Sequence, residues 1–123
     1  MADEITVAGS LSLTNGSLDR QVTIPDITPD QADAIAMSNL QSIPTTAAGT
    51  AIDVGDVANQ GWAFIKNNDA TNYVELGIQT GGVFFPFAKL LPAEWCLTRL
   101  SVVTTFARAD TAACDLDYFI FET

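Results

Sequence analysis

Four short runs of aromatic and β-branched residues, separated by turn-forming residues, fill the stretch between positions 61 and 100. The runs cover residues 61–66, 73–78, 83–90 and 94–100. Aromatic and β-branched side chains favour strands, and the clusters of Asn, Asp, Gly and Pro between the runs favour turns. The pattern therefore predicts a meander of antiparallel strands, in which the intervening segments are hairpin loops.

The N-terminal segment predicts a β-hairpin. Residues 4–13 and 18–24 alternate between apolar and polar side chains, with Gly9 at a candidate bulge. Asn15 and Gly16 lie between the two runs. Both residue types tolerate the positive φ of a type I′ turn, which we expect here. On the return strand the alternation places one set of residues on a single face, namely Leu18, Arg20, Val22 and Ile24.

One segment before the centre of the chain has two competing interpretations. A capping-box pattern of Thr28 with Gln31 predicts a short helix over residues 29–37. Residues 34–43 alternate instead, with a polar, serine-rich second face that suits a half-exposed strand. We favour the strand, preceded by a turn at 28–33.

The whole chain predicts an all-β fold. Further strand-like runs lie at 51–54, 101–108 and 114–121, which makes roughly eight to ten strands in total with almost no helix. This profile is typical of an antiparallel β-sandwich, jelly-roll-like, with little or no helix. Pro86 has no backbone N–H to donate, so we expect it on an edge strand or at a bulge. A length of 123 residues predicts a single domain over 1–123.

Acidic residues dominate the charge. The chain has 15 Asp plus Glu against 5 Lys plus Arg, a formal net charge of −10. Such a field repels phosphate backbones and anionic lipids, so we expect neither nucleic acid nor a membrane surface as a partner. There is no apolar run of about 18 residues and no basic start followed by an apolar core, so we expect no membrane span or secretory signal. Synthesis in a cytoplasm is the resulting expectation.

The two cysteines are expected to be free thiols. Cys96 and Cys114 both lie inside apolar strand-like runs, where a thiol behaves as a small buried hydrophobe. A cytosolic origin also disfavours disulfides. A bridge between the two remains the alternative, if their strands are neighbours in one sheet.

Most catalytic chemistry lacks its usual residues in this chain. There is no histidine, which removes the commonest general base and the commonest transition-metal ligand. Carboxylate pairs for glycoside hydrolysis would be Asp115 with Asp117 or Glu75 with Glu94. Alternate acids on a strand are more often a solvated face. Loop carboxylates that offer calcium ligands, without EF-hand spacing, are Asp26, Asp30 and Asp33, or Asp53 and Asp56. We expect no enzyme activity, catalytic residue, cofactor or metal site.

Aromatic side chains are concentrated in the strand-like runs. Alternating aromatic residues usually fill the space between two sheets, and we favour this core interpretation over a groove for sugar or peptide. In the last run, however, Phe119 and Phe121 lie on the opposite face from Tyr118. A strand that is apolar on both sides indicates a second buried surface, as in an oligomer. The candidate interface residues are Trp62, Phe85, Phe87, Trp95, Phe119 and Phe121.

Several blocks in the second half of the chain resemble a small family of tailed-bacteriophage virion proteins. The blocks are Gly-Trp-Ala-Phe-Ile-Lys-Asn at 61–67, Asp-Ala-Thr-Asn-Tyr-Val-Glu-Leu-Gly at 69–77, Phe-Pro-Phe-Ala-Lys-Leu at 85–90, Pro-Ala-Glu at 92–94 and Ala-Asp-Thr-Ala-Ala at 109–113. The opening block at 4–7 fits loosely, and residues 25–50 depart from the pattern. The resemblance implies a structural protein of the particle, in its head or tail, without enzymatic activity.

Within that family, a capsid decoration or cement protein is the expectation we favour. It would dock on the shell of the major capsid protein as a symmetric oligomer such as a trimer, on the capsid exterior, after synthesis in the bacterial host cytoplasm. The alternatives are a tail-fibre module that binds a receptor or glycan through Trp62 or Trp95, and a tail-tube or neck component.

Overall fold

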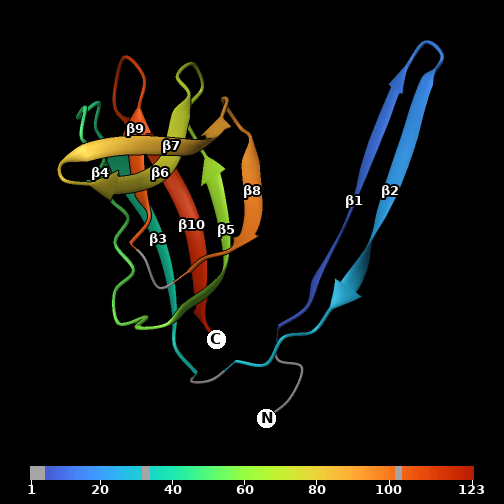
Figure 1. Cartoon of the computed structure of the whole chain (residues 1–123), viewed down its shortest axis with the longest axis horizontal. Coiled ribbons are helices and arrows are strands. Elements are labelled where there is room, and N and C mark those ends of the chain that lie inside the picture. Colours follow the sequence, from blue (N-terminus) through green and yellow to red (C-terminus); the bar gives the residue numbers. More distant parts are fainter. Residues whose placement is uncertain (1–4, 32–33, 102–103) are drawn as a thin grey trace. The chain divides into compact units, whose positions relative to one another are not determined.

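The computed structural model of the chain describes residues 5–31, 34–101 and 104–123, which form ten strands (Figure 1). This described part contains no helix, and so no helix that could cross a bilayer. The all-β prediction is confirmed. The chain divides into two compact units, Met1–Ala32 and Asp33–Thr123. The first unit is a two-stranded hairpin without a second layer, so it does not enclose a core of its own. A single domain over 1–123 therefore stays a prediction.

The first unit is a two-stranded antiparallel hairpin of β1 (Val7–Asn15) and β2 (Leu18–Ile27). Leu11 lies opposite Val22, and the next pair, Ser12 with Gln21, points to the other face. The register shifts between Val7 and Gly9, as the predicted bulge at Gly9 requires. The hairpin and the shared face of β2 were therefore predicted correctly.

The turn of this hairpin differs from the predicted one. Asn15 pairs with Leu18, which leaves Gly16 and Ser17 as a two-residue loop. Gly16 has a φ of 58°, and Ser17 is not among the residues with positive φ. Glycine with positive φ at the first of two loop positions is the type II′ pattern. The predicted type I′ turn is wrong because Asn15 extends the strand pairing by one position.

The second unit is a sandwich of two four-stranded antiparallel sheets. The β10 sheet has the order β3 (Ala36–Ile43), β10 (Cys114–Glu122), β5 (Gln60–Asn67) and β8 (Trp95–Arg99). The β6 sheet has the order β4 (Thr50–Ala51), β9 (Phe106–Ala109), β6 (Val74–Thr80) and β7 (Val83–Leu90). Only β6 and β7 are consecutive strands that pair within a sheet. This strand order is that of a jelly roll, in agreement with the predicted fold class.

The predicted meander over residues 61–100 is wrong, although its strands exist. β5 pairs with β10 and β8, whereas β6 pairs with β7 and β9, so residues 68–73 cross between the sheets. Only the turn at Gly81 and Gly82, with φ of 58° and 79°, closes a hairpin. The composition of a loop favours a change of direction but does not say which sheet the next strand joins.

The strand favoured over a helix before residue 43, and the edge or bulge position of Pro86, were predicted correctly. Residues 36–43 form β3 and not a helix, and two positions of the predicted preceding turn, 32 and 33, lie outside the described residues. β7 is an edge strand, and its register with β6 shifts opposite Pro86. Both features accommodate a residue without a backbone N–H. The strand expected at 51–54 is shorter, because β4 ends at Ala51.

Aliphatic side chains fill most of the core, contrary to the aromatic core that we favoured. The buried cluster includes Ile43, Ile65, Val74, Leu76, Leu116 and Ile120. Its one aromatic member is Tyr118, whose hydroxyl donates to the Asp53 carbonyl oxygen at 2.6 Å and accepts from Asn39 Nδ2 at 3.1 Å. Phe84 is also buried. Cys96 and Cys114 are both free thiols, as expected.

Candidate interaction surfaces

The outer face of the β10 sheet carries most of the predicted interface residues. Phe119 on β10 lies opposite Phe64 on β5, which lies opposite Leu97 on β8. Trp62, Trp95 and Phe121 occupy alternate positions of the same three strands and so share this face. We call this set the aromatic face: Trp62, Phe64, Trp95, Leu97, Phe119 and Phe121.

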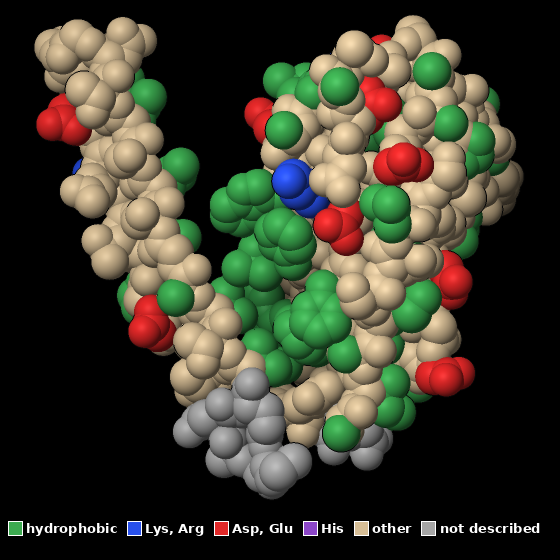
Figure 2. All heavy atoms as spheres, turned by 180° about the vertical axis from the view of Figure 1, so that it is seen from behind, with side chains coloured by type: hydrophobic (Ala, Val, Ile, Leu, Met, Phe, Trp, Pro, Cys, Tyr) green, Lys and Arg blue, Asp and Glu red, His purple; other side chains and the backbone are tan. Residues whose placement is uncertain are grey.

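The aromatic face is packed within itself and open on its outer side. The Phe119 and Phe121 rings meet edge to face, with centroids 4.5 Å apart, and the Phe64 and Trp95 rings are 5.7 Å apart. Trp95 remains 59% exposed. Figure 2 shows hydrophobic side chains gathered in one broad area of the sandwich surface, whereas acidic side chains are scattered. Contiguous exposed apolar surface of this kind is uncommon on monomeric proteins, so the aromatic face is a candidate interaction surface.

A second apolar surface lies along strand β7, at the edge of the β6 sheet. Phe85 lies opposite Ile78, and Val83 lies opposite Thr80. Phe87 falls at the register shift and is 61% exposed. We call Ile78, Val83, Phe85 and Phe87 the β7 patch. The predicted set of six residues is thus divided between two different sheets.

A third apolar surface lies on the hairpin, and the sequence reasoning did not identify it as a surface. Its members, all exposed, are Leu11, Leu13, Leu18, Val22 and Ile24. The cross-strand register places them on one face, which we call the hairpin's apolar face, together with the single charge of Arg20. The alternation in residues 18–24 grouped part of this face correctly. Its exposure follows from the tertiary structure, because β1 and β2 form a sheet of two strands with no second layer within the described hairpin unit.

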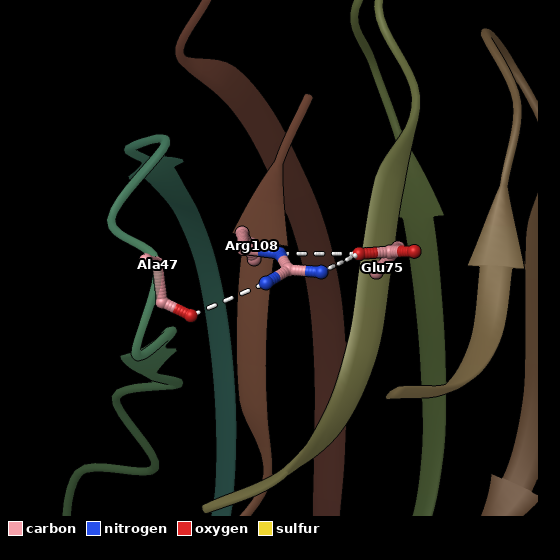
Figure 3. Close-up of polar contacts among 3 residues, drawn as sticks. All are labelled: Ala47, Glu75 and Arg108. Carbon is pink, nitrogen blue, oxygen red and sulfur yellow. Dashed lines mark hydrogen bonds and ion pairs between the residues drawn. The ribbon is translucent and has the colours of Figure 1, made fainter. Parts of the chain in front are cut away.

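The hollow beside β6 and β9 is polar. It has a volume of about 270 Å³, and its lining includes Thr45, Tyr73, Glu75, Arg108 and Asp110. Arg108 Nη2 donates to Glu75 Oε2 at 2.6 Å, and Arg108 Nη1 donates to the Ala47 carbonyl oxygen at 3.2 Å (Figure 3). A hydrogen bond with Asp110 raises the pKa of the Tyr73 hydroxyl. Glu75 therefore acts as the ion-pair partner of Arg108 across β6 and β9.

The other carboxylates of the predicted pairs have separate roles. Glu94 Oε2 accepts from the Leu91 backbone N–H at 2.8 Å and so closes the turn before β8. Asp115 and Asp117 lie on the outer face of β10, as the alternation predicts. Of the calcium candidates, Asp53 accepts from the Gly55 backbone N–H, and Asp33 lies outside the described residues. No group of three or more potential metal ligands occurs within residues 5–31, 34–101 and 104–123.

Similarity to known proteins adds no family assignment. Comparison with protein-family models, with curated proteins and with solved structures gave no match. The functional inference therefore depends on the jelly roll, its two apolar surfaces and the hairpin.

Proposed function

We propose that this protein is a structural component of a tailed-phage particle, a capsid decoration or cement protein that docks on the shell of the major capsid protein. The observation that carries the proposal is the β7 patch. β7 is an open edge strand whose exposed side chains include Phe85 and Phe87. Open edges pair with other chains, and exposed aromatic side chains anchor such contacts in pockets of the partner.

Three further features support this role. The jelly roll is a fold that viral capsid proteins use, although a fold alone does not specify a function. The blocks between residues 61 and 113 resemble tailed-phage virion proteins. The net charge of −10 suits a protein on the outside of particles, because like charges keep the particles from clumping.

The β7 edge also limits uncontrolled pairing. Pro86 has no backbone N–H, and the register shift beside it interrupts the strand. An edge of this kind resists indefinite strand addition between identical copies, but it can still accept one matched partner. We further propose that the protein docks as a symmetric oligomer, such as a trimer, on the capsid exterior.

Purified particles test the proposal. We expect the protein to co-purify with intact heads in stoichiometric amounts, and particles that lack it to be less stable to heat. Phe85→Ser combined with Phe87→Ser should reduce its occupancy on heads. Leu40→Ser removes a comparably exposed side chain from the other sheet and should leave occupancy unchanged. A protein found only free in solution, or only in tails, contradicts the decoration role.

A second candidate function has its own observation in favour. Trp95 is 59% exposed, and its ring is tilted against that of Phe64. The exposed indole ring of Trp95 offers a flat apolar surface to a sugar. A tail-fibre module that binds a receptor glycan would use such a ring. Glycan-array binding that Trp95→Ala abolishes and Phe87→Ser leaves intact would favour this function over capsid decoration.

A further inference from the structure

We infer that Asn15 is a site of spontaneous deamidation, in which the backbone nitrogen of Gly16 attacks the side-chain amide of Asn15. The reaction converts Asn15 into a mixture of aspartate and isoaspartate at the turn that joins β1 to β2 (Figure 1). This inference concerns residues of the first unit alone, and it does not depend on the proposed function.

The residue after Asn15 leaves the attacking nitrogen uncrowded. Asn15 and Gly16 form the only Asn-Gly step in the sequence. Glycine has no Cβ to shield its own backbone nitrogen, and it adopts the positive φ of 58° found here without strain. Every other asparagine precedes a residue with a side chain, which crowds the equivalent nitrogen; these are Asn39, Asn59, Asn67, Asn68 and Asn72. The local sequence therefore favours attack at Asn15 over attack at the others.

Hydrogen bonds hold most of the other asparagine side chains. Asn67 is fully buried, and its amide makes three hydrogen bonds to backbone groups. Three more donate or accept through their side chains, namely Asn39, Asn59 and Asn72. Attack on a bonded amide must first break these bonds, which costs free energy. Asn15 and Asn68 are both exposed, and of these two only Asn15 precedes a glycine.

The end of the hairpin opens at low cost. Asn15 and Leu18 form the last pair of the ladder, and both residues are exposed. The ends of a secondary-structure element fray with a free energy close to zero, and a sheet of two strands is marginally stable. The rotation of Asn15 that brings its Cγ to the Gly16 nitrogen therefore breaks only this terminal pair.

The reaction needs water and no other co-reactant. The Gly16 nitrogen gives up its proton and forms a bond with Asn15 Cγ. The bond between Cγ and Nδ2 breaks, and Nδ2 takes up a proton and leaves as ammonia, which gives a succinimide ring. Water then opens the ring. Attack at Cγ yields aspartate, whereas attack at the backbone carbonyl carbon of Asn15 yields isoaspartate, in which the main chain runs through Cγ.

Either product alters the end of the hairpin. Each adds one negative charge to a chain whose formal net charge is already −10. Isoaspartate also adds one methylene group to the main chain, at the position that pairs with Leu18. Strand pairing requires a regular main-chain repeat, so the ladder of the isoaspartate form should end one pair earlier, at Thr14 and Asp19.

Tryptic mapping of aged full-length protein tests the inference. Cleavage after Arg20 releases residues 1–20, which contain Asn15 as their only asparagine and no glutamine. On incubation in mildly alkaline buffer, this peptide should gain the mass difference between an NH2 and an OH group and should separate into two products. Edman degradation of the isoaspartate product should stop at Asn15, because its main chain is no longer linked through the α-carboxyl group.

Asn68 is the matched control within the same molecule. It is exposed like Asn15 but precedes Asp69, and fragmentation of the peptide 67–89 locates any change at Asn68. We expect Asn15 to react at least about tenfold faster than Asn68, which corresponds to a barrier lower by about 1.4 kcal/mol.

A variant tests the part played by the glycine. Gly16→Asp keeps a residue type that tolerates positive φ, but it adds a side chain beside the attacking nitrogen. The loss of Asn15 should slow at least about tenfold in this variant. Circular dichroism checks that the variant folds. In the wild-type protein the rate should also rise with pH, because the deprotonated nitrogen is the nucleophile.

Three results overturn the inference. The first is an Asn15 that reacts no faster than Asn68. The second is an unchanged rate at Asn15 in the Gly16→Asp variant. The third is aspartate as the sole product, because direct hydrolysis of the side-chain amide by water gives no isoaspartate. None of these results bears on the co-purification with heads, which tests the proposed function.

Discussion

Replacing Asn67 by alanine should destabilise the sandwich at the point where the chain crosses between its sheets. Asn67 ends β5 and is fully buried. Its Nδ2 donates to the carbonyl oxygens of Asn72 at 2.9 Å and Leu90 at 3.1 Å, and its Oδ1 accepts from the Asp69 N–H at 2.9 Å. One side chain thus connects the crossing loop to the end of β7. Alanine removes all three bonds.

The magnitude follows from these three bonds. Each backbone group that loses its partner in a buried site costs about 1–3 kcal/mol. The bond to the Leu90 carbonyl oxygen is buried and the bonds to Asn72 and Asp69 are partly buried, so together they give a loss of about 3 kcal/mol, which is a large share of a total stability of about 5–15 kcal/mol. For a chain of this size, the midpoint of thermal unfolding should fall by roughly 10 °C or more.

Urea denaturation followed by circular dichroism measures this loss. Asn68→Ala is the matched control, because Asn68 is the adjacent residue, its side chain is exposed, and its backbone N–H, which alanine keeps, donates to the Asp115 carbonyl oxygen. The control should change the free energy of unfolding by less than about 0.5 kcal/mol. A loss below about 1 kcal/mol in Asn67→Ala would refute the structural role given to this amide.

Three further predictions concern buried or constrained groups. Tyr118→Phe should cost about 1–3 kcal/mol. Burial raises the pKa of Tyr118 above its ordinary value of 10. The stability that Tyr118 contributes should therefore be intact below pH 10 and should be lost as the pH rises through its raised pKa. Urea denaturation at alkaline pH would measure this loss. Gly77→Ala should cost about 2 kcal/mol or more by thermal denaturation, because its Cβ would lie 2.3 Å from the Phe85 carbonyl oxygen. The hydrogen bond from the Asn72 backbone N–H lowers the pKa of Asp69. The charged Asp69 carboxylate should therefore stabilise its loop above about pH 4, and this stabilisation should be lost as the pH falls further. NMR titration of the Asp69 carboxyl group would measure the pKa.

Each of these predictions has a contradicting outcome. Tyr118 that ionises at its ordinary pKa in the folded protein would contradict the first. Gly81→Asn is the control for Gly77→Ala, because Gly81 has open space around it and a φ of 58° that asparagine tolerates. Equal losses in the two glycine variants would contradict the steric explanation. An Asp69 pKa at or above that of an unstructured peptide would contradict the third.

The local periodicity of the sequence determined which residues form strands and which of them share a face. In β10 the buried side chains of Leu116, Tyr118 and Ile120 alternate with Phe119 and Phe121, as the pattern predicts. The N-terminal hairpin and the edge position of Pro86 were predictable for the same reason. Alternation and the lack of a proline N–H act within one strand or between adjacent residues, so no distant contact is needed to read them.

The connection between β5 and β6 depended on contacts between distant segments. Residues 68–73 look like a hairpin loop, but the pairing of β5 with β10 and β8 sends the next strand to the other sheet. The buried bonds of Asn67 hold this crossing. A turn-forming composition describes only the local change of direction, whereas the partner of each strand is decided by the closure of the whole sandwich.

The tertiary structure also decided which apolar face points inward. On β5 the sequence offers Trp62 and Phe64 on one face and Ala63 and Ile65 on the other, both of them apolar. Hydrophobicity alone does not choose between two such faces. The space between two packed sheets admits small and branched side chains at these positions, and Ala63 and Ile65 are fully buried there. The larger aromatic rings of Trp62 and Phe64 therefore lie on the outer face.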